Sequence, residues 1–354
     1  MKYTRILFAF LLLGFSYILF STAYAADEGS HAADFLSHGV GARALGMGSA
    51  FVAIADDATA TYWNPAGLTK VQKHSFSAMY SDTFSTGDGS FFSRGLVNYN
   101  FVNYVHQIEG IGSLGLSWIR LGIDDIPRTT FIDVDNNGFL GDFQDINGNG
   151  IKDAGEPYID RPTVAEYFSN NDNALLISYA RQVHTMVAVG GNLKLLSQSI
   201  FENSGRGFGI DIGLILYPYK GLRLGTILLD ATGTQIRWDT EDNPVFTRER
   251  RLRFGGGYQF TFPNFGKGSI SIDFETNQAD LEEGTESGGG LVMRTGAEYW
   301  LFNTLALRCG WNGDGVSAGT GFQVRVSTMT FFVDYAFNTH TLGGSQRISV
   351  SGQF

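Results

Sequence analysis

The stretch that decides the fold is the last one, Arg347-Ile348-Ser349-Val350-Ser351-Gly352-Gln353-Phe354. Successive side chains of a β-strand point to opposite faces. Ile348, Val350 and Phe354 therefore share one face, and polar side chains occupy the other. A soluble sheet can alternate in this way, but a barrel whose outer face meets lipid must do so.

The same alternation recurs about fourteen times between residue 73 and the end of the chain. The segment 206–217 is an example. One face carries the apolar residues Phe208, Ile210, Ile212, Leu214 and Leu216, and the other carries Gly209, Asp211 and Gly213. The predicted strands are 73–81, 91–107, 111–123, 174–183, 186–196, 206–217, 222–230, 251–262, 268–275, 291–299, 305–311, 321–326, 329–337 and 347–354.

The connections between these strands alternate between short turns and long polar segments. Outer-membrane barrels have short periplasmic turns and longer external loops, whereas a soluble sandwich has no reason to keep this order. The sequence therefore predicts an all-β fold, a transmembrane antiparallel up-and-down barrel of about 14 strands. We expect it in the bacterial outer membrane, with both termini in the periplasm and the long loops outside.

The composition agrees with a lipid-exposed protein. Charged residues are 17% of the 354 residues, below the roughly 25% of soluble domains, and aromatic residues reach 14%. Residues 1–25 have the features of a secretory signal peptide, with Lys2 and Arg5 first, then an apolar run and Ala23-Tyr24-Ala25. The alternative, an uncleaved anchor, requires a longer apolar run. Without this segment 23 basic residues face 35 acidic ones, which argues against nucleic acid as a partner.

Many charged residues fall on the predicted inner face of the strands. Such side chains are costly against lipid but not in a wet lumen, so we expect them to form structural salt bridges there. They are Lys194, Asp211, Arg223, Arg251, Arg253, Asp273, Glu275, Arg294, Glu298, Arg308, Arg325, Asp334 and Arg347.

Residues 26–72 do not alternate like the rest, and small residues dominate in them. Asp56 or Asp57 can cap a short helix that runs to about Trp63, and Asn64-Pro65 then ends it. A compact segment of small residues ahead of a barrel is suited to the lumen. The sequence therefore predicts an N-terminal plug at 26–72 and the barrel at 73–354.

The stretch GARALGMGSAFVAIADDATATYWNPAGL, residues 41–68, resembles the N-terminal hatch of the FadL superfamily of outer-membrane proteins. It is closer to the PorV/PorQ branch, as is the ending FFVDYAFNTHTLGGSQRISVSGQF. The resemblance implies a fourteen-stranded barrel with the hatch inside, and Asn64, Pro65 and Ala66 match the hatch motif. The alternative for these three residues is a plain turn that ends a helix.

The resemblance also implies two functions. PorV-type members serve type IX secretion, with exported proteins or the secretion machinery as partners beside the membrane lipid. FadL-type members move long-chain fatty acids or other hydrophobic small molecules across the outer membrane. The branch motifs favour secretion, with hydrophobic transport as the alternative. The sequence contains no Ser/His/Asp constellation, phosphate loop or His/Cys cluster, so we do not expect an enzyme.

The predicted loop at 124–173 contains a calcium-binding pattern of the EF-hand type. Its ligands would be Asp145, Asn147, Asn149, the carbonyl of Ile151, Asp153 and Glu156. A second, weaker loop begins with Asp133, Asp135 and Asn137 but has Gln144 where the closing acid belongs. No amphipathic helices flank the pattern, so we expect structural calcium in a rigid loop. The alternative is a solvated cluster of Asx turns.

Overall fold

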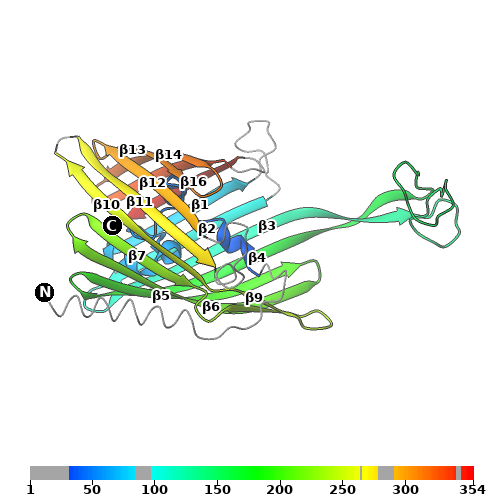
Figure 1. The fold of residues 1–354 in the computed structure, drawn as a ribbon, viewed down its shortest axis with the longest axis horizontal. Coiled ribbons are helices and arrows are strands. Elements are labelled where there is room, and N and C mark those ends of the chain that lie inside the picture. Colours follow the sequence, from blue (N-terminus) through cyan, green and yellow to red (C-terminus); the bar gives the residue numbers. More distant parts are fainter. Residues whose placement is uncertain (1–31, 84–96, 264, 278–290, 340–343) are drawn as a thin grey trace. The chain divides into compact units, whose positions relative to one another are not determined.

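The computed structural model describes residues 32–83, 97–263, 265–277, 291–339 and 344–354. The predicted signal peptide, 1–25, and residues 26–31 of the predicted plug lie outside them. The described chain forms an antiparallel barrel, in which each strand pairs with its neighbours and β1 pairs with β16 to close the ring (Figure 1).

Fourteen strands make up the ring, which confirms the predicted fold. Thirteen of them join in chain order from β1 to β7 and from β11 to β16, with β10 paired to both β7 and β11. Their bounds are β1 His74–Thr83, β2 Val97–Ile108, β3 Gly112–Ile132, β4 Arg161–His184, β5 Val187–Ile200, β6 Asn203–Tyr219, β7 Leu222–Leu229, β10 Arg251–Phe262, β11 Gly266–Asn277, β12 Val292–Leu301, β13 Leu305–Trp311, β14 Val316–Val326, β15 Met329–Asn338 and β16 Ser345–Gln353.

The alternation in the sequence sets the two faces of the barrel. In β6, Phe208 and Ile212 point outward and are 60% and 50% exposed, whereas Asp211 between them is buried. Cys309 of β13 also lies on the outer face and is exposed. A closed ring leaves no unpaired strand edge, and its apolar outer face suits contact with lipid.

The predicted long loop at 124–173 is strand at both of its ends. β3 and β4 continue far beyond the ring as a two-stranded ribbon, which projects away from the barrel (Figure 1). In it Thr129 pairs with Val164 and Thr130 with Thr163. β-Branched and aromatic residues favour a strand wherever a partner strand is present, and this pairing overrides the polar character of the segment. Only residues 133–160 form the tip.

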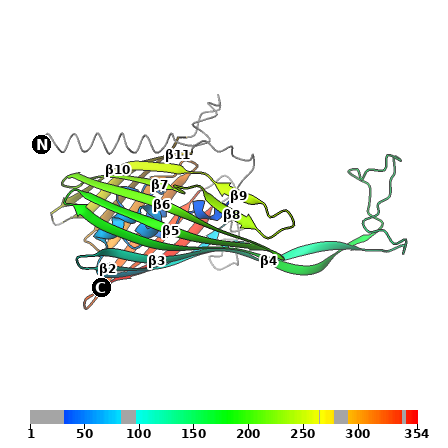
Figure 2. The ribbon, with the colours of Figure 1, turned by 90° about the horizontal axis from the view of Figure 1, so that it is seen from below.

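The predicted loop at 231–250 is also partly ordered, as the hairpin β8 (Thr234–Trp238) and β9 (Val245–Arg248). β7 pairs with one end of β6, and β8 pairs with the other end, at 205–208 (Figure 2). Asp230, with a φ of 53°, lies at the break between them. The chain thus bends once and then continues along the same neighbour.

The N-terminal segment contains four short helices and lies against the inner face of the strands. They are η1 Asp34–Ser37, α2 Ala42–Gly46, α3 Ala60–Trp63 and η2 Pro65–Lys70. Phe51 and Trp63 are buried in one apolar cluster with Phe101, Ile119 and Leu176 of the barrel wall. The core therefore lies inside the ring. In the described residues, every helix is too short or too polar to cross a membrane.

Candidate functional site

Inward-facing glycines mark where the N-terminal segment touches the barrel wall. A Cβ on Gly213 of β6 would lie 2.2 Å from Asn64 Oδ1, and one on Gly225 of β7 would lie 2.5 Å from the carbonyl oxygen of Val52. On the opposite wall, Cβ atoms on Gly296 and Gly310 would lie 2.2 and 2.4 Å from backbone atoms of residues 47 and 48. No larger side chain fits there. The segment therefore contacts the wall on both sides of the lumen.

Asn64 is the most connected residue of the predicted hatch motif. Its Nδ2 lies 3.0 Å from the carbonyl oxygen of Val52, 3.2 Å from that of Leu214 in β6 and 3.3 Å from that of Thr226 in β7. Its Oδ1 accepts the Ala66 N–H at 3.2 Å and caps η2, with Pro65 in the first turn. Asn64 thus ends α3, as the plain-turn alternative has it, and also joins the segment to two strands.

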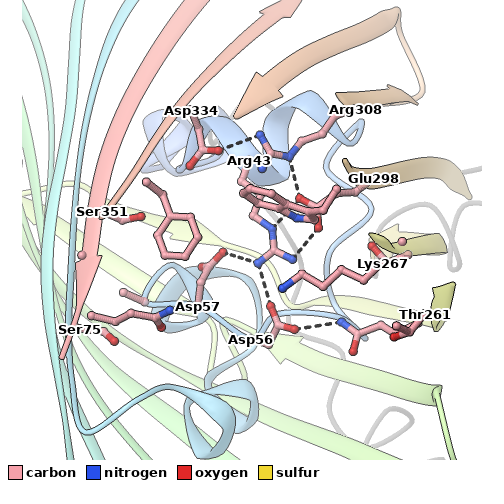
Figure 3. A pocket seen from close by; sticks show the side chains of 18 of the residues that line it. Arg43, Asp56, Asp57, Ser75, Thr261, Lys267, Glu298, Arg308, Asp334 and Ser351 are labelled. Carbon is pink, nitrogen blue, oxygen red and sulfur yellow. Dashed lines mark hydrogen bonds and ion pairs between the residues drawn. The ribbon is translucent and has the colours of Figure 1, made fainter. Parts of the chain in front are cut away.

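Arg43 of α2 forms the second attachment (Figure 3). Its Nε and Nη2 donate to the two carboxylate oxygens of Glu298 in β12, both at 2.9 Å. Its Nη1 donates to Asp56 at 2.8 Å and to Asp57 at 2.9 Å. Paired hydrogen bonds between a guanidinium and a carboxylate are strong and directional. Arg43 therefore clamps the segment to itself and to the wall.

Two further arginines of the wall extend this cluster. Arg308 Nε donates to Glu298 at 2.7 Å, and its Nη1 lies 2.8 Å from Asp334. Arg223 of β7 reaches Asp56 at 3.2 Å. The sequence predicted inward charges but not their partners. Its prediction that Asp56 or Asp57 caps the helix is wrong, because α3 has Thr59 at its N-cap without a side-chain cap, and both aspartates pair with Arg43.

A cavity of about 290 Å³ lies beside the Arg43 cluster (Figure 3). Its lining combines charged groups of the cluster with Lys267 and with the aromatic side chains of Trp300 and Phe332. It therefore has both a polar and an apolar wall. Since residues of the segment and of the barrel both line it, its size depends on where the segment lies.

A separate network crosses the other half of the lumen. Glu275 of β11 accepts Arg253 and Arg294 at 2.6 Å each, and Lys194 lies 2.6 Å from Asp211. Arg248 of β9 donates to Ser37 in η1 at 2.9 Å, so this network also holds the N-terminal segment. The prediction of structural salt bridges on the inner face is confirmed for these residues.

The ribbon tip contains the predicted calcium loop. Asp145 accepts the backbone N–H groups of residues 148–150. Glu156 accepts the backbone N–H groups of Ile146 and Asp153, both at 2.9 Å. Asp153 Oδ2 accepts the amides of Asn147 and Asn149 at 2.6 and 2.7 Å. Ile151 lies at the exposed turn. Hydrogen bonds thus join the predicted ligands within one tight loop.

The second loop gains an acid that the sequence pattern did not show. Carboxylate oxygens of Asp133, Asp135 and Asp160 lie within 4.8 Å of one another, a spacing that suits a metal ion. Asp160 lies outside the twelve-residue pattern, so only the pairing of β3 with β4 reveals it. Backbone N–H donors, first that of Val134, lower the pKa of the Asp160 carboxyl.

No protein-family model matches the sequence, and no curated protein matches it. The fold is similar to solved barrels. The Ralstonia pickettii toluene transporter TbuX has a TM-score of 0.54 at 13% identity over 89% of this chain and 97% of its own. The monoaromatic hydrocarbon channel CymD has a TM-score of 0.51 at 14% identity over 89% and 96%. The Pseudomonas putida toluene transporter TodX has 0.50 at 12% over 89% and 96%. These likenesses show a shared barrel fold.

Proposed function

We propose that this chain is an outer-membrane channel for small hydrophobic compounds, closed by its own N-terminal segment. The observation that carries the proposal is how residues 32–72 occupy the lumen. They are attached by side-chain hydrogen bonds and ion pairs and share no strand pairing with the barrel. Such a segment can shift without opening the ring. The similar structures are titled as toluene transporters and a hydrocarbon channel, which supports transport over catalysis and over secretion.

The lumen wall suits an apolar solute on one side. Phe101, Ile119 and Leu176 line it from β2, β3 and β4, and the N-terminal segment covers them. Charged groups line the rest of the lumen, from Lys194 in β5, directly beside Leu176, round to Asp334 in β15. A solute would therefore pass along the apolar wall once the segment moves. The proposed orientation has both termini in the periplasm and the ribbon outside.

Uptake of a radiolabelled monoaromatic hydrocarbon by proteoliposomes tests this function. The wild type should pass the hydrocarbon slowly and a sugar of similar size hardly at all. Arg43→Ala should increase hydrocarbon entry several-fold, because it releases α2 from Glu298. The exposed, outward Arg181→Ala serves as the matched control. If hydrocarbon entered proteoliposomes with the wild type or Arg43→Ala no faster than it enters protein-free liposomes, the channel proposal would be rejected.

The ribbon tip is the observation that favours the second candidate, assistance to exported proteins. The tip exposes several large apolar side chains, and those of Phe139, Leu140, Ile146 and Ile151 are the most exposed. A partner protein could cover them. Replacing residues 126–168 by a short Gly-Ser turn should leave hydrocarbon uptake unchanged if the chain is a channel. Loss of exported proteins from the cell surface in this variant, with uptake at background, would favour secretion instead.

We also propose that the tip binds structural calcium. Carboxylate and carbonyl oxygens in a twelve-residue loop are the ligands calcium prefers, and extracellular sites of this kind have dissociation constants of roughly 10⁻⁴–10⁻³ M. Calcium should slow proteolysis within 133–160 at millimolar concentration. The Asp145→Ala, Glu156→Ala double variant should lose this protection, and Asp160→Asn should lose part of it. If calcium protected both variants from proteolysis as well as it protects the wild type, the proposed calcium site would be rejected.

A further inference from the structure

The outer face of the barrel has a row of basic and polar residues that transport does not explain. Hydrogen-bonded pairing places Arg120 of β3 beside Asn173, Asn173 beside Ser197, Ser197 beside Arg206 of β6, and Arg206 beside Arg237 of β8. Neighbouring strands are about 4.8 Å apart, so the row spans roughly 19 Å. Figure 2 shows these strands side by side.

Arg206 and Arg237 stand directly opposite each other on two paired strands. Both are exposed, while Ile236, the next residue along β8, is buried on the inner face. Like charges in directly opposed positions destabilise a sheet unless something neutralises them. Within the described part of the chain, neither arginine forms an ion pair. Arg206 interacts electrostatically with Asp239, but the Asp239 carboxylate already accepts the N–H and Oγ of Ser204.

An apolar row lies directly beside the basic one, on the side toward the barrel. It consists of Trp118, Leu175, Leu195 and Phe208, which pair in the same order across β3 to β6. Phe208 is 60% exposed and Leu195 is 43% exposed. Arg120 is held in place by Asn171, whose Oδ1 accepts its Nε at 3.2 Å. A basic row above an apolar row matches an amphiphile with an anionic head and hydrocarbon chains.

We propose that this outer surface binds the phosphate headgroup of a membrane lipid, with Arg206 and Arg237 as the central ligands and Trp118, Leu195 and Phe208 against its chains. Two guanidinium groups can bind one phosphate through paired, charge-assisted hydrogen bonds. The row lies at the end of the barrel that carries the ribbon, so the lipid belongs to the leaflet on that side. The inference rests on the proposed membrane location and not on transport.

Native mass spectrometry of the full barrel in neutral detergent tests the site. The probes are a diphosphorylated glycolipid (lipid A), the same lipid without its phosphates, and inorganic phosphate. The wild type should prefer the diphosphorylated lipid at least tenfold, and Arg206→Gln/Arg237→Gln should lose that preference. Arg206→Lys/Arg237→Lys should keep most of it. Arg181→Gln, an outward arginine at the other end of β4, should bind like the wild type.

Equal binding of the diphosphorylated lipid by the glutamine variant would overturn the proposal, as would equal binding of the two lipids by the wild type. Full competition by inorganic phosphate at the lipid's own concentration would show a free-anion site and overturn the lipid assignment. Thermal unfolding distinguishes lipid binding by the two arginines from a role in stabilising the fold. Without lipid, the glutamine variant should unfold no earlier than the wild type, because it relieves repulsion; earlier unfolding would contradict the proposal. Hydrocarbon uptake reports separately on the channel.

Discussion

Asn64 shows how much one residue adds to a motif. The sequence placed Asn64, Pro65 and Ala66 at the end of a helix, and α3 does end there. It could not show that the Asn64 amide reaches the carbonyl groups of Leu214 and Thr226, which are 150 and 162 residues away. Contacts of that sequence separation depend on strand register, and a single sequence shows a register only where one face is buried. Asp160 escaped prediction for the same reason.

Replacing Asn64 by alanine removes its hydrogen bonds to the carbonyl groups of Val52, Leu214 and Thr226. We expect the free energy of unfolding to fall by roughly 2 kcal/mol. Hydrocarbon uptake should rise, because η2 is then no longer tied to β6 and β7. Thermal unfolding and proteoliposome uptake measure the two effects. An unchanged uptake with lowered stability would show that Asn64 holds the fold and has no part in closure.

Gly213→Ala should reproduce the effects of Asn64→Ala while Asn64 itself is left unsubstituted. Its Cβ would lie 2.2 Å from Asn64 Oδ1, so the amide must move. Gly256→Ala is the matched control, because its Cβ would lie 3.5 Å from Leu224 Cδ2 and make an ordinary contact. Uptake should rise in the first variant only. Equal uptake by the two variants would mean that the position of Asn64 against β6 does not control hydrocarbon uptake.

At the scale of elements, the strands of the ring could be predicted and the ribbon could not. Each ring strand has one face toward lipid and one toward the lumen, which writes a period of two into the sequence. The ribbon has water on both faces, so Thr129, Thr130 and Thr163 leave no such period. The hairpin of β8 and β9 is too short to show such a period in the sequence. Its pairing to β6 depends on the bend at Asp230.

The ribbon tip should respond to acid. Hydrogen bonds from the amides of Asn147 and Asn149 lower the pKa of Asp153, and backbone N–H donors lower those of Glu156 and Asp160. A carboxyl with a lowered folded-state pKa stabilises the fold above its unfolded value of roughly 4. The protection of amides within 133–160, relative to the exchange rate of an unstructured peptide at the same pH, should therefore stay constant from about pH 7 to pH 5 and fall below about pH 4. A loss of this protection already at about pH 6 would contradict this account.

At the scale of the molecule, the barrel and the N-terminal segment in its lumen are held by different kinds of contact. The ring is held by continuous strand pairing that closes between β1 and β16. Residues 32–72 are held by side-chain contacts, among them those of Asn64, Arg43 and Arg248, and by the apolar packing of Phe51 and Trp63. These contacts are local, and none of them is part of the strand pairing that closes the ring. Movement of the segment is therefore the step that the channel proposal requires.

A disulfide between the segment and the wall tests that step most directly. A Cβ on Gly257 would lie 3.7 Å from the Cβ of Ala53, within the disulfide range of about 3.5–4.5 Å. The variant is Ala53→Cys/Gly257→Cys, with Ile54→Ala to make room and Cys309→Ser to remove the native thiol. Hydrocarbon uptake is measured on the same proteoliposomes before and after reduction. The account predicts that uptake falls to that of protein-free liposomes when the variant is oxidised and recovers when it is reduced; equal uptake in both states would contradict it.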